Sequence, residues 1–199
     1  MNRTVFIAAV VAASLSALAG RARAQDKTPF AAQDFSATMV STAPNGQQVS
    51  MKVYRAGDKM RTDMPGGKAY NVTILSQRKI FMVMPQMCMQ MPQTAPQPFE
   101  WKGTVERTRV GTGTADGHPA IIERVTVTPG GNQKPVTMKV WEATDLKRFP
   151  VRIEIPTPKG AARMDYKNID LSTPPASLFA IPDNCRTMPM MPGMPHPPL

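Results

Sequence analysis

The sequence predicts a mainly β protein built from a meandering antiparallel sheet of about ten strands. Turn residues recur roughly every 8 to 12 positions between Phe35 and Ile169, a spacing typical of such sheets. Apolar and polar residues alternate with a period of two, as in Val49, Met51 and Val53, so each strand has one apolar face. After residue 24, no stretch of about ten residues or more has the period of an amphipathic helix. The apolar face of the sheet therefore has no predicted helical layer to cover it.

The first half of the chain alternates strands with turn signals. Combinations of Pro, Asn and Gly that accept positive φ angles separate the strands, as at Pro44-Asn45-Gly46 and Pro65-Gly66-Gly67. Methionines alternate with polar residues in several of these strands. We expect strands at residues 34–42, 49–55, 59–64, 70–75 and 80–84.

A proline-rich loop at residues 92–98 precedes the second half of the chain. We expect one helical turn at residues 144–147, and a short 3₁₀ or α turn at 174–179, where paired prolines can begin a helix but cannot continue it. Further strands are expected at residues 104–114, 120–128, 136–142, 151–155 and 162–169. Residues 25–187 are thus expected to form a single β domain.

Residues 1–24 have the pattern of a secretory signal peptide. Arg3 precedes an uncharged apolar run, and Ala22-Arg23-Ala24 supplies the small residues that signal peptidase recognises before Gln25. The apolar run, residues 5–19, is shorter than the roughly 20 residues that a membrane-spanning helix requires. We expect cleavage after Ala24 and a soluble protein in the periplasm.

The chain carries an excess of positive charge. It has 24 Lys and Arg residues against 14 Asp and Glu, and removal of Arg3, Arg21 and Arg23 leaves 21 against 14, a net charge of +7. This excess favours solubility, or transient attraction to an anionic membrane surface. Export and the lack of a clustered basic run argue against nucleic acid as a partner.

Few residues in the sequence are suited to catalysis. The two histidines are His118, in a Gly-His-Pro turn, and His196 near the C-terminus, and neither has the sequence context of a catalytic base. Two cysteines and two histidines scattered along the chain do not form the closely spaced ligand set of structural zinc. We therefore expect no catalytic residues, no enzyme activity and no cofactor, with Cu(I) as the one metal to consider.

Cys88 and Cys185 are the only two cysteines, and an even number in an exported protein favours a disulfide. The alternative is a Cys88 thiolate that joins methionine sulfurs around Cu(I), because soft sulfur ligands prefer soft metals. The disulfide is the preferred interpretation, and the copper site stays open as the second.

The methionines of the strands form one of two methionine groups. Several of them are expected to share one face of the sheet, where they form either a methionine-rich core or the wall of a cavity for varied apolar ligands. The predicted ligand-binding residues are Met51, Met60, Met64, Met82 and Met84.

The second methionine group lies in residues 188–199, a tail that we expect to be disordered because its prolines exclude both helix and sheet. Thioethers and an imidazole on an exported tail suit Cu(I), and a linker without ligand is the alternative. The candidate metal ligands are Met188, Met190, Met191, Met194 and His196.

An ordered set of short motifs spans about residues 35–188. The motifs are residues 53–61, 82–85 with 89–92, 111–114 with 117–119, 140–143, 166–169 and 178–182. In this order they resemble a family of exported bacterial domains related to the LolA/LolB-like lipoprotein carriers. The resemblance implies an antiparallel incomplete (half) β-barrel whose concave side can hold acyl chains, with no catalytic residues. Two departures are the missing covering helices and the pair of cysteines.

The combined prediction is a soluble, periplasmic, non-enzymatic binding or carrier module. It would hold a lipid or another apolar molecule on the methionine-lined concave face of the half-barrel. The alternatives are a periplasmic Cu(I)-binding protein that acts through its C-terminal tail, and a structural envelope protein without a ligand. The sequence does not name the ligand.

Overall fold

The computed structural model describes residues 33–92, 103–129 and 134–187. These residues form one 12-stranded sheet and one short 3₁₀ helix, η1 (Ala176–Phe179). None of the helical structure in these ranges has the length and apolar character required to cross a bilayer. The strands are β1 (Phe35–Thr42), β2 (Gln48–Ala56), β3 (Lys59–Asp63), β4 (Tyr70–Ile74), β5 (Lys79–Met84), β6 (Met87–Pro92), β7 (Gly103–Ala115), β8 (His118–Pro129), β9 (Val136–Ala143), β10 (Phe149–Thr157), β11 (Gly160–Asp170) and β12 (Arg186–Thr187).

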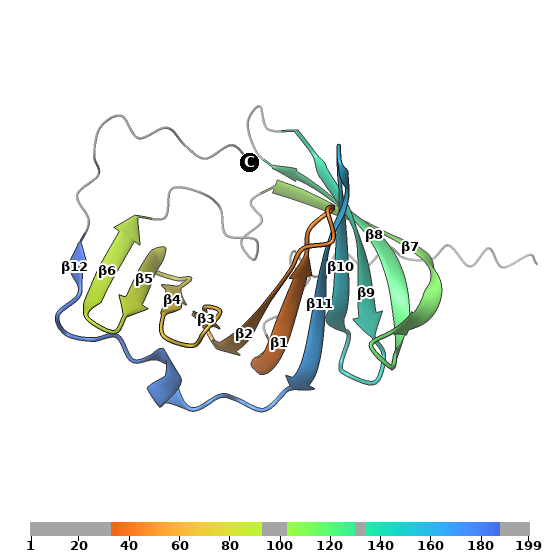
Figure 1. The fold of residues 1–199 in the computed structure, drawn as a ribbon. Helices are drawn as coiled ribbons and strands as arrows, with labels where there is room; N and C mark the ends of the chain where they lie inside the picture. The colour runs from red at the N-terminus through yellow and green to blue at the C-terminus, as the bar shows by residue number, and fades with distance from the viewer. Residues whose placement is uncertain (1–32, 93–102, 130–133, 188–199) are drawn as a thin grey trace, which may run out of the picture.

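The strand order is β12-β6-β5-β4-β3-β2-β1-β11-β10-β9-β8-β7. Neighbouring strands are antiparallel, except for β12, which pairs in parallel with β6. Strands β12 and β7 form the two free edges, so the sheet curls without closing, as Figure 1 shows. The predicted mainly β fold and its half-barrel form are therefore confirmed. The bounds of β6 and β12 were not among the strands expected from the sequence.

The inner side of the curled sheet carries the larger core. Phe149 packs edge-on against Phe35, with ring centroids 4.9 Å apart, and against Tyr166 at 5.8 Å. Val140 and Val151 are completely buried in the same cluster. This core joins β8–β11 to β1–β3, so the inner face is closed over that part of the sheet.

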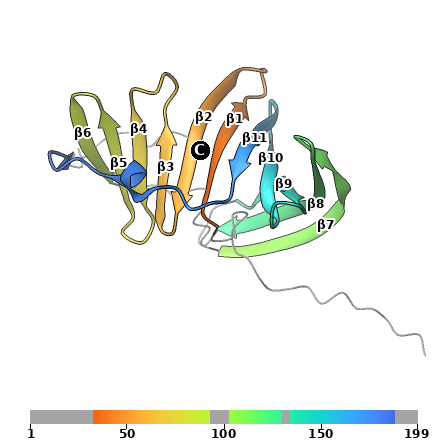
Figure 2. The same ribbon diagram turned by 90° about the horizontal axis from the view of Figure 1, so that it is seen from below.

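A second, smaller core lies on the outer side, beneath the C-terminal strap (residues 171–187). After β11 the strap crosses β3–β6, as Figure 2 shows from below. Phe179 of η1 is buried in a cluster with Val72, Ile74 and Phe81, because these side chains point to the outer side of β4 and β5. The apolar residues of the inner face are thus covered by packing between strands of the curled sheet, and those of the outer face by the C-terminal strap.

Asp34 ties the strap to the start of β1. Its carboxylate accepts hydrogen bonds from the Gly57 N–H at 2.8 Å and from the Thr173 hydroxyl at 2.7 Å. Both bonds stabilise the ionised carboxylate and lower the pKa of Asp34. One side chain therefore joins β1, the β2–β3 turn and the first residues of the strap.

The expected helical turn at residues 144–147 is wrong. Lys147 and Arg148 have φ angles of 51° and 65°, in the left-handed region, which ends any right-handed helix. The segment is instead a hydrogen-bonded turn, in which the Arg148 N–H donates to the Ala143 carbonyl at 2.9 Å. The second expected turn is present as η1. Residues 1–24, most of the loop at 92–98 and the tail at 188–199 lie outside the described residues.

Candidate functional site

Five methionines of β5 and β6 form a continuous patch on the inner face. Strand pairing sets Met82 opposite Met89, and Met84 opposite Met87. Met91 lies two residues beyond Met89 and therefore points to the same side. We call Met82, Met84, Met87, Met89 and Met91 the methionine patch. Four of them are half-buried, and Met87 retains 47% of its surface exposed.

The register also shows where the predicted ligand-binding methionines lie. Met51 pairs with Met39 and is half-buried. Met60 lies on the same face but is only 5% exposed, because it belongs to the larger inner core. Met64 follows β3 and is half-buried. A role in ligand binding stays a prediction for Met51 and Met64, and the burial of Met60 favours the alternative of a methionine-rich core for that residue.

Met82 and Met84 are the two predicted residues that the structure places in the methionine patch. Their partners Met87, Met89 and Met91 belong to the strand methionines that the sequence predicts can share one face, but they were not among the five predicted ligand-binding residues. A signal for them was present, because Pro85 and Gln86 form a tight turn between two alternating methionine segments. A hairpin at that turn brings both segments onto one face.

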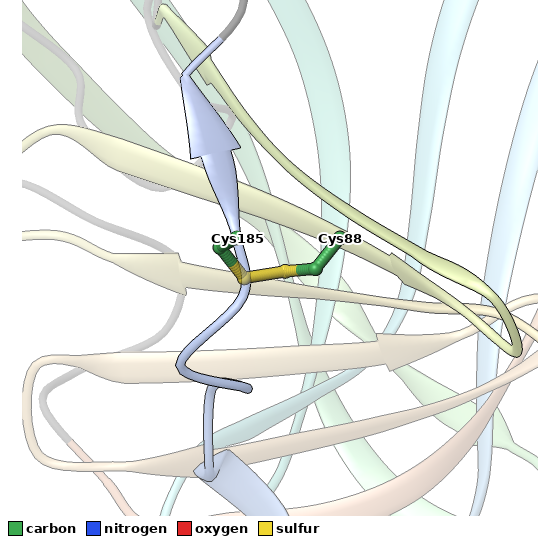
Figure 3. Close-up of a disulfide and its surroundings, with 2 residues drawn as sticks. All are labelled: Cys88 and Cys185. Carbon is green, nitrogen blue, oxygen red and sulfur yellow. A yellow bond between two sulfur atoms is a disulfide. The ribbon is translucent and has the colours of Figure 1, made fainter.

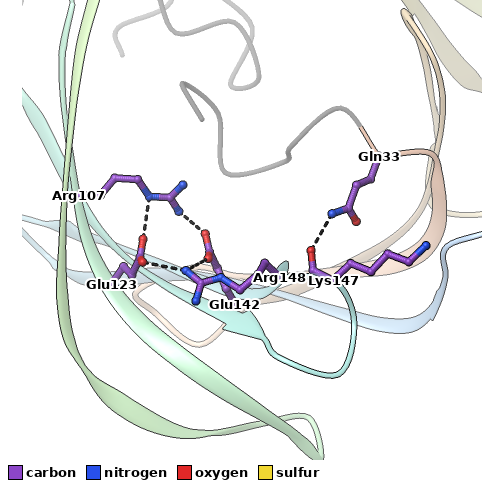
Figure 4. A network of polar contacts seen from close by, with 6 residues as sticks. All are labelled: Gln33, Arg107, Glu123, Glu142, Lys147 and Arg148. Carbon is purple, nitrogen blue, oxygen red and sulfur yellow. Dashed lines mark hydrogen bonds and ion pairs between the residues drawn. The ribbon is translucent and has the colours of Figure 1, made fainter. Parts of the chain in front are cut away.

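A closed network of charges lies on the inner face of the opposite half of the sheet (Figure 4). Arg107 donates to Glu123 at 2.7 Å and to Glu142, and Arg148 donates to Glu123 at 2.9 Å and to Glu142 at 2.6 Å. Glu142 is almost fully buried, and its loss of hydration raises its pKa, while the two guanidinium groups oppose the rise. Each carboxylate has two cationic partners, so every charge of the network is paired within it.

His118 makes one polar contact, at the turn end of β8. Its Nδ1 lies 2.8 Å from Asp145 Oδ2, and this hydrogen bond lowers the pKa of Asp145. The neighbouring Thr144 hydroxyl donates to the Pro119 carbonyl at 3.2 Å, and this hydrogen bond stabilises the turn after β9. Within the described ranges, no group of three or more His, Cys, Asp and Glu side chains is placed to hold a metal ion.

Cys88 and Cys185 form the predicted disulfide, shown in Figure 3. Their Cα atoms are 4.4 Å apart, and the bond joins β6 to the strap immediately before β12. Cys88 is buried, because it points to the outer side of β6 next to Val83. In this disulfide Cys88 has a structural role and is not a free thiolate that could bind copper. The candidate copper ligands Met188, Met190, Met191, Met194 and His196 lie outside the described residues.

No protein-family model matches the chain, and no curated protein sequence matches it. Several solved structures are similar to it at low identity. A LolA superfamily protein from Nitrosomonas europaea is 12% identical with a TM-score of 0.41, and the match covers 76% of this chain and 92% of that one. The lipoprotein LppX from Mycobacterium tuberculosis is 11% identical with a TM-score of 0.40, covering 71% and 88%. A DUF1329 family protein from Desulfovibrio piger is 12% identical with a TM-score of 0.39, covering 78% and 91%.

Proposed function

We propose that this protein is a non-enzymatic carrier that holds an acyl chain or a similar apolar molecule against the methionine patch. The observation that supports this function is the register of β5 and β6, which gathers five methionines on the inner face of an open sheet. Accessible apolar side chains gathered on one face are typical of binding sites. Thioether side chains are flexible and polarizable, so they adapt to apolar ligands of varied shape.

The contrast between the two halves of the inner face supports the same function. In the half that contains β8–β11, Val140 and Val151 have no exposed surface. In the half that contains β5 and β6, the patch methionines keep part of their surface accessible. The patch methionines are therefore free to change their contacts when a ligand enters, whereas the closely packed valines are not.

The carrier function requires no reacting group. Its affinity would come from burial of apolar area, which contributes about 25 cal/mol per Å². The four charged groups of the network, Arg107, Glu123, Glu142 and Arg148, are already paired with one another. We place this carrier in the periplasm because residues 1–24 have the pattern of a signal peptide.

The test is to replace Met82 and Met89 by Gln, singly and together, and to titrate an apolar fluorescent dye and a fatty acid. Glutamine preserves the length of the side chain but adds a polar amide to the contact surface. We expect the double variant to bind about tenfold more weakly, since a loss of about 1.4 kcal/mol corresponds to that factor. The melting temperature should change little, because both side chains are half-buried.

Met60→Gln is the matched control, because Met60 lies on the same face but in the closed core. This variant should lower the melting temperature strongly. The proposed function is wrong if the parent protein binds neither probe and the Met82 and Met89 variants lose as much stability as the Met60 variant does.

A further inference from the structure

A cavity of about 480 Å³ lies where β6 meets β12, at the free edge of the sheet beside the methionine patch. Its apolar side includes Met87 and Met89 of the patch. The rest of the lining comes from Gln86, Cys88, Asn184, Arg186 and Thr187, of which Arg186 carries a positive charge. One cavity thus combines an apolar wall with a positive charge.

The disulfide determines which way Arg186 points. Cys185 is bonded to Cys88 and packs with the outer cluster that contains Phe179. Successive side chains of a strand point to opposite faces, so Arg186 points to the inner side. The pairing of β12 with β6 agrees, because it sets Arg186 opposite Met89.

A cross-strand row runs inward from this arginine. Arg186 pairs with Met89, Met89 pairs with Met82, and Met82 pairs with Asn71. Adjacent strands are about 4.8 Å apart, so the row from β12 to β4 spans about 14 Å. The row begins at a cation and continues over two methionines. An anionic amphiphile has the matching arrangement, with a negatively charged head group followed by an apolar chain.

Arg186 differs from the two arginines of the charge network. Arg107 and Arg148 are each held by two carboxylates. Among the described residues, no carboxylate forms an ion pair with Arg186, and its side chain is exposed in the cavity. A guanidinium can donate two parallel hydrogen bonds to a carboxylate or a phosphate, which makes it a selective partner for such groups.

We infer that this cavity binds the anionic head group of an amphiphile whose acyl chain lies along the methionine patch. The inference rests on the proposed carrier function and narrows its ligand class to acyl chains with a negatively charged head. Arg186 is the residue that selects the head group. The methionines bind the chain without distinguishing one head group from another.

The experiment compares three probes by displacement of a bound apolar dye: palmitate, the uncharged 1-hexadecanol, and acetate as a free anion without a chain. The parent protein should bind palmitate about tenfold more tightly than hexadecanol at low salt. Arg186→Gln should remove that preference and leave hexadecanol binding unchanged, while Arg186→Lys should keep part of it. The preference should shrink as salt increases, because the arginine is exposed.

Lys159→Gln is the control variant, because it removes one exposed positive charge at the β10–β11 turn, in the other half of the sheet. It should leave the preference for palmitate intact, and melting curves should show that all variants are folded. The inference is overturned if Arg186→Gln still prefers palmitate, or if acetate displaces the dye as well as palmitate does. If neither palmitate nor hexadecanol binds to the parent protein, the carrier function itself is wrong.

Discussion

Met60 and Met89 show how one residue type serves two purposes on one face of this sheet. The strand register places both side chains on the inner side. Met60 is 5% exposed because the core that joins β1–β3 to β8–β11 closes over it. Met89 lies on β6, three strands nearer to the β12 edge than Met60 on β3, and it is only half-buried. The position of a methionine along the sheet therefore decides whether it stabilises the fold or remains accessible to a ligand.

A first prediction at the residue scale concerns the buried charge of Glu142. In Arg107→Met, Glu142 keeps only Arg148 as a cationic partner. Breaking a buried ion pair typically costs about 3 kcal/mol, and we expect a loss of this order in the free energy of unfolding at pH 7. Urea denaturation measures this loss.

The loss should be smaller at pH 5 than at pH 7. Burial already raises the pKa of Glu142, and removal of Arg107 raises it further. The folded variant then holds a proton that the unfolded chain has released, so its stability increases as the pH falls through this range. Arg109→Met, at an exposed position of the same strand, should show no such pH dependence. An equal loss at both pH values would mean that Arg107 acts only through packing.

At the scale of elements, the C-terminal strap has the role that helices have in many sheet proteins. It covers the outer side of β3–β6 with few apolar residues, of which Phe179 is the most buried. Arg61 reinforces it, since its guanidinium donates to the Leu178 carbonyl at 2.9 Å and stacks 3.8 Å above the Tyr70 ring. The strap is therefore a structural element rather than a loose extension of the domain.

We predict that Phe179→Ala lowers the free energy of unfolding by about 3 kcal/mol. The substitution leaves a cavity between η1 and the side chains of Val72 and Phe81. Ser177→Ala is the control in the same 3₁₀ helix, at an exposed position, and should cost little. Chemical denaturation of both variants would show whether the strap contributes to the global stability. Equal stability of the two variants would contradict that contribution.

A second prediction for this element concerns the disulfide. Cys88 and Cys185 are 97 residues apart in sequence, and in the chain-entropy model a bond across such a loop raises the free energy of unfolding by about 4.7 kcal/mol, because it restricts the unfolded chain. We expect Cys88→Ser with Cys185→Ser to unfold at a clearly lower denaturant concentration. Limited proteolysis should cut the double variant within residues 171–187 before it cuts elsewhere. A variant that resists protease as the parent does would show that packing alone holds the strap.

At the scale of the whole molecule, one open sheet carries two cores on opposite faces. The inner core closes the half that contains β8–β11, and the strap closes the outer side of β3–β6. The inner side of β5 and β6 carries methionines that remain accessible. Placing a ligand there would bury the methionine patch without any change in the sheet order.

We predict that the protein isolated from the periplasm of its own cells begins at Gln25 and carries a lipid. Native mass spectrometry would show the processed chain with an added mass, and organic extraction would release that mass. The copper alternative predicts instead an added metal that is lost when the chain is truncated after Thr187. A chain with neither addition, or one that retains residues 1–24, would contradict this prediction.

Local information was sufficient for most of the strands. Turn residues and the period of two are properties of short segments, so the expected strand at residues 70–75 matches β4, and the turn at Pro44-Asn45-Gly46 lies between β1 and β2 with Gly46 at a φ of 84°. The cysteine count predicted the bond between Cys88 and Cys185, because there was one possible pair. These features depend on neighbouring residues or on simple counts.

Only the tertiary structure decided the features that depend on distant segments. β12 has two residues, too few for any period, and it pairs with β6 immediately after the disulfide that joins the strap to that strand. The charge network joins β7, β8, β9 and the turn after β9 through the strand register, and its members are up to 41 residues apart in sequence, from Arg107 to Arg148. The sequence by itself determined the strands and the alternation of their faces, because backbone conformation responds to local side chains. The placement of Arg186 beside the methionine patch required the folded sheet, because it follows from which strand lies next to which.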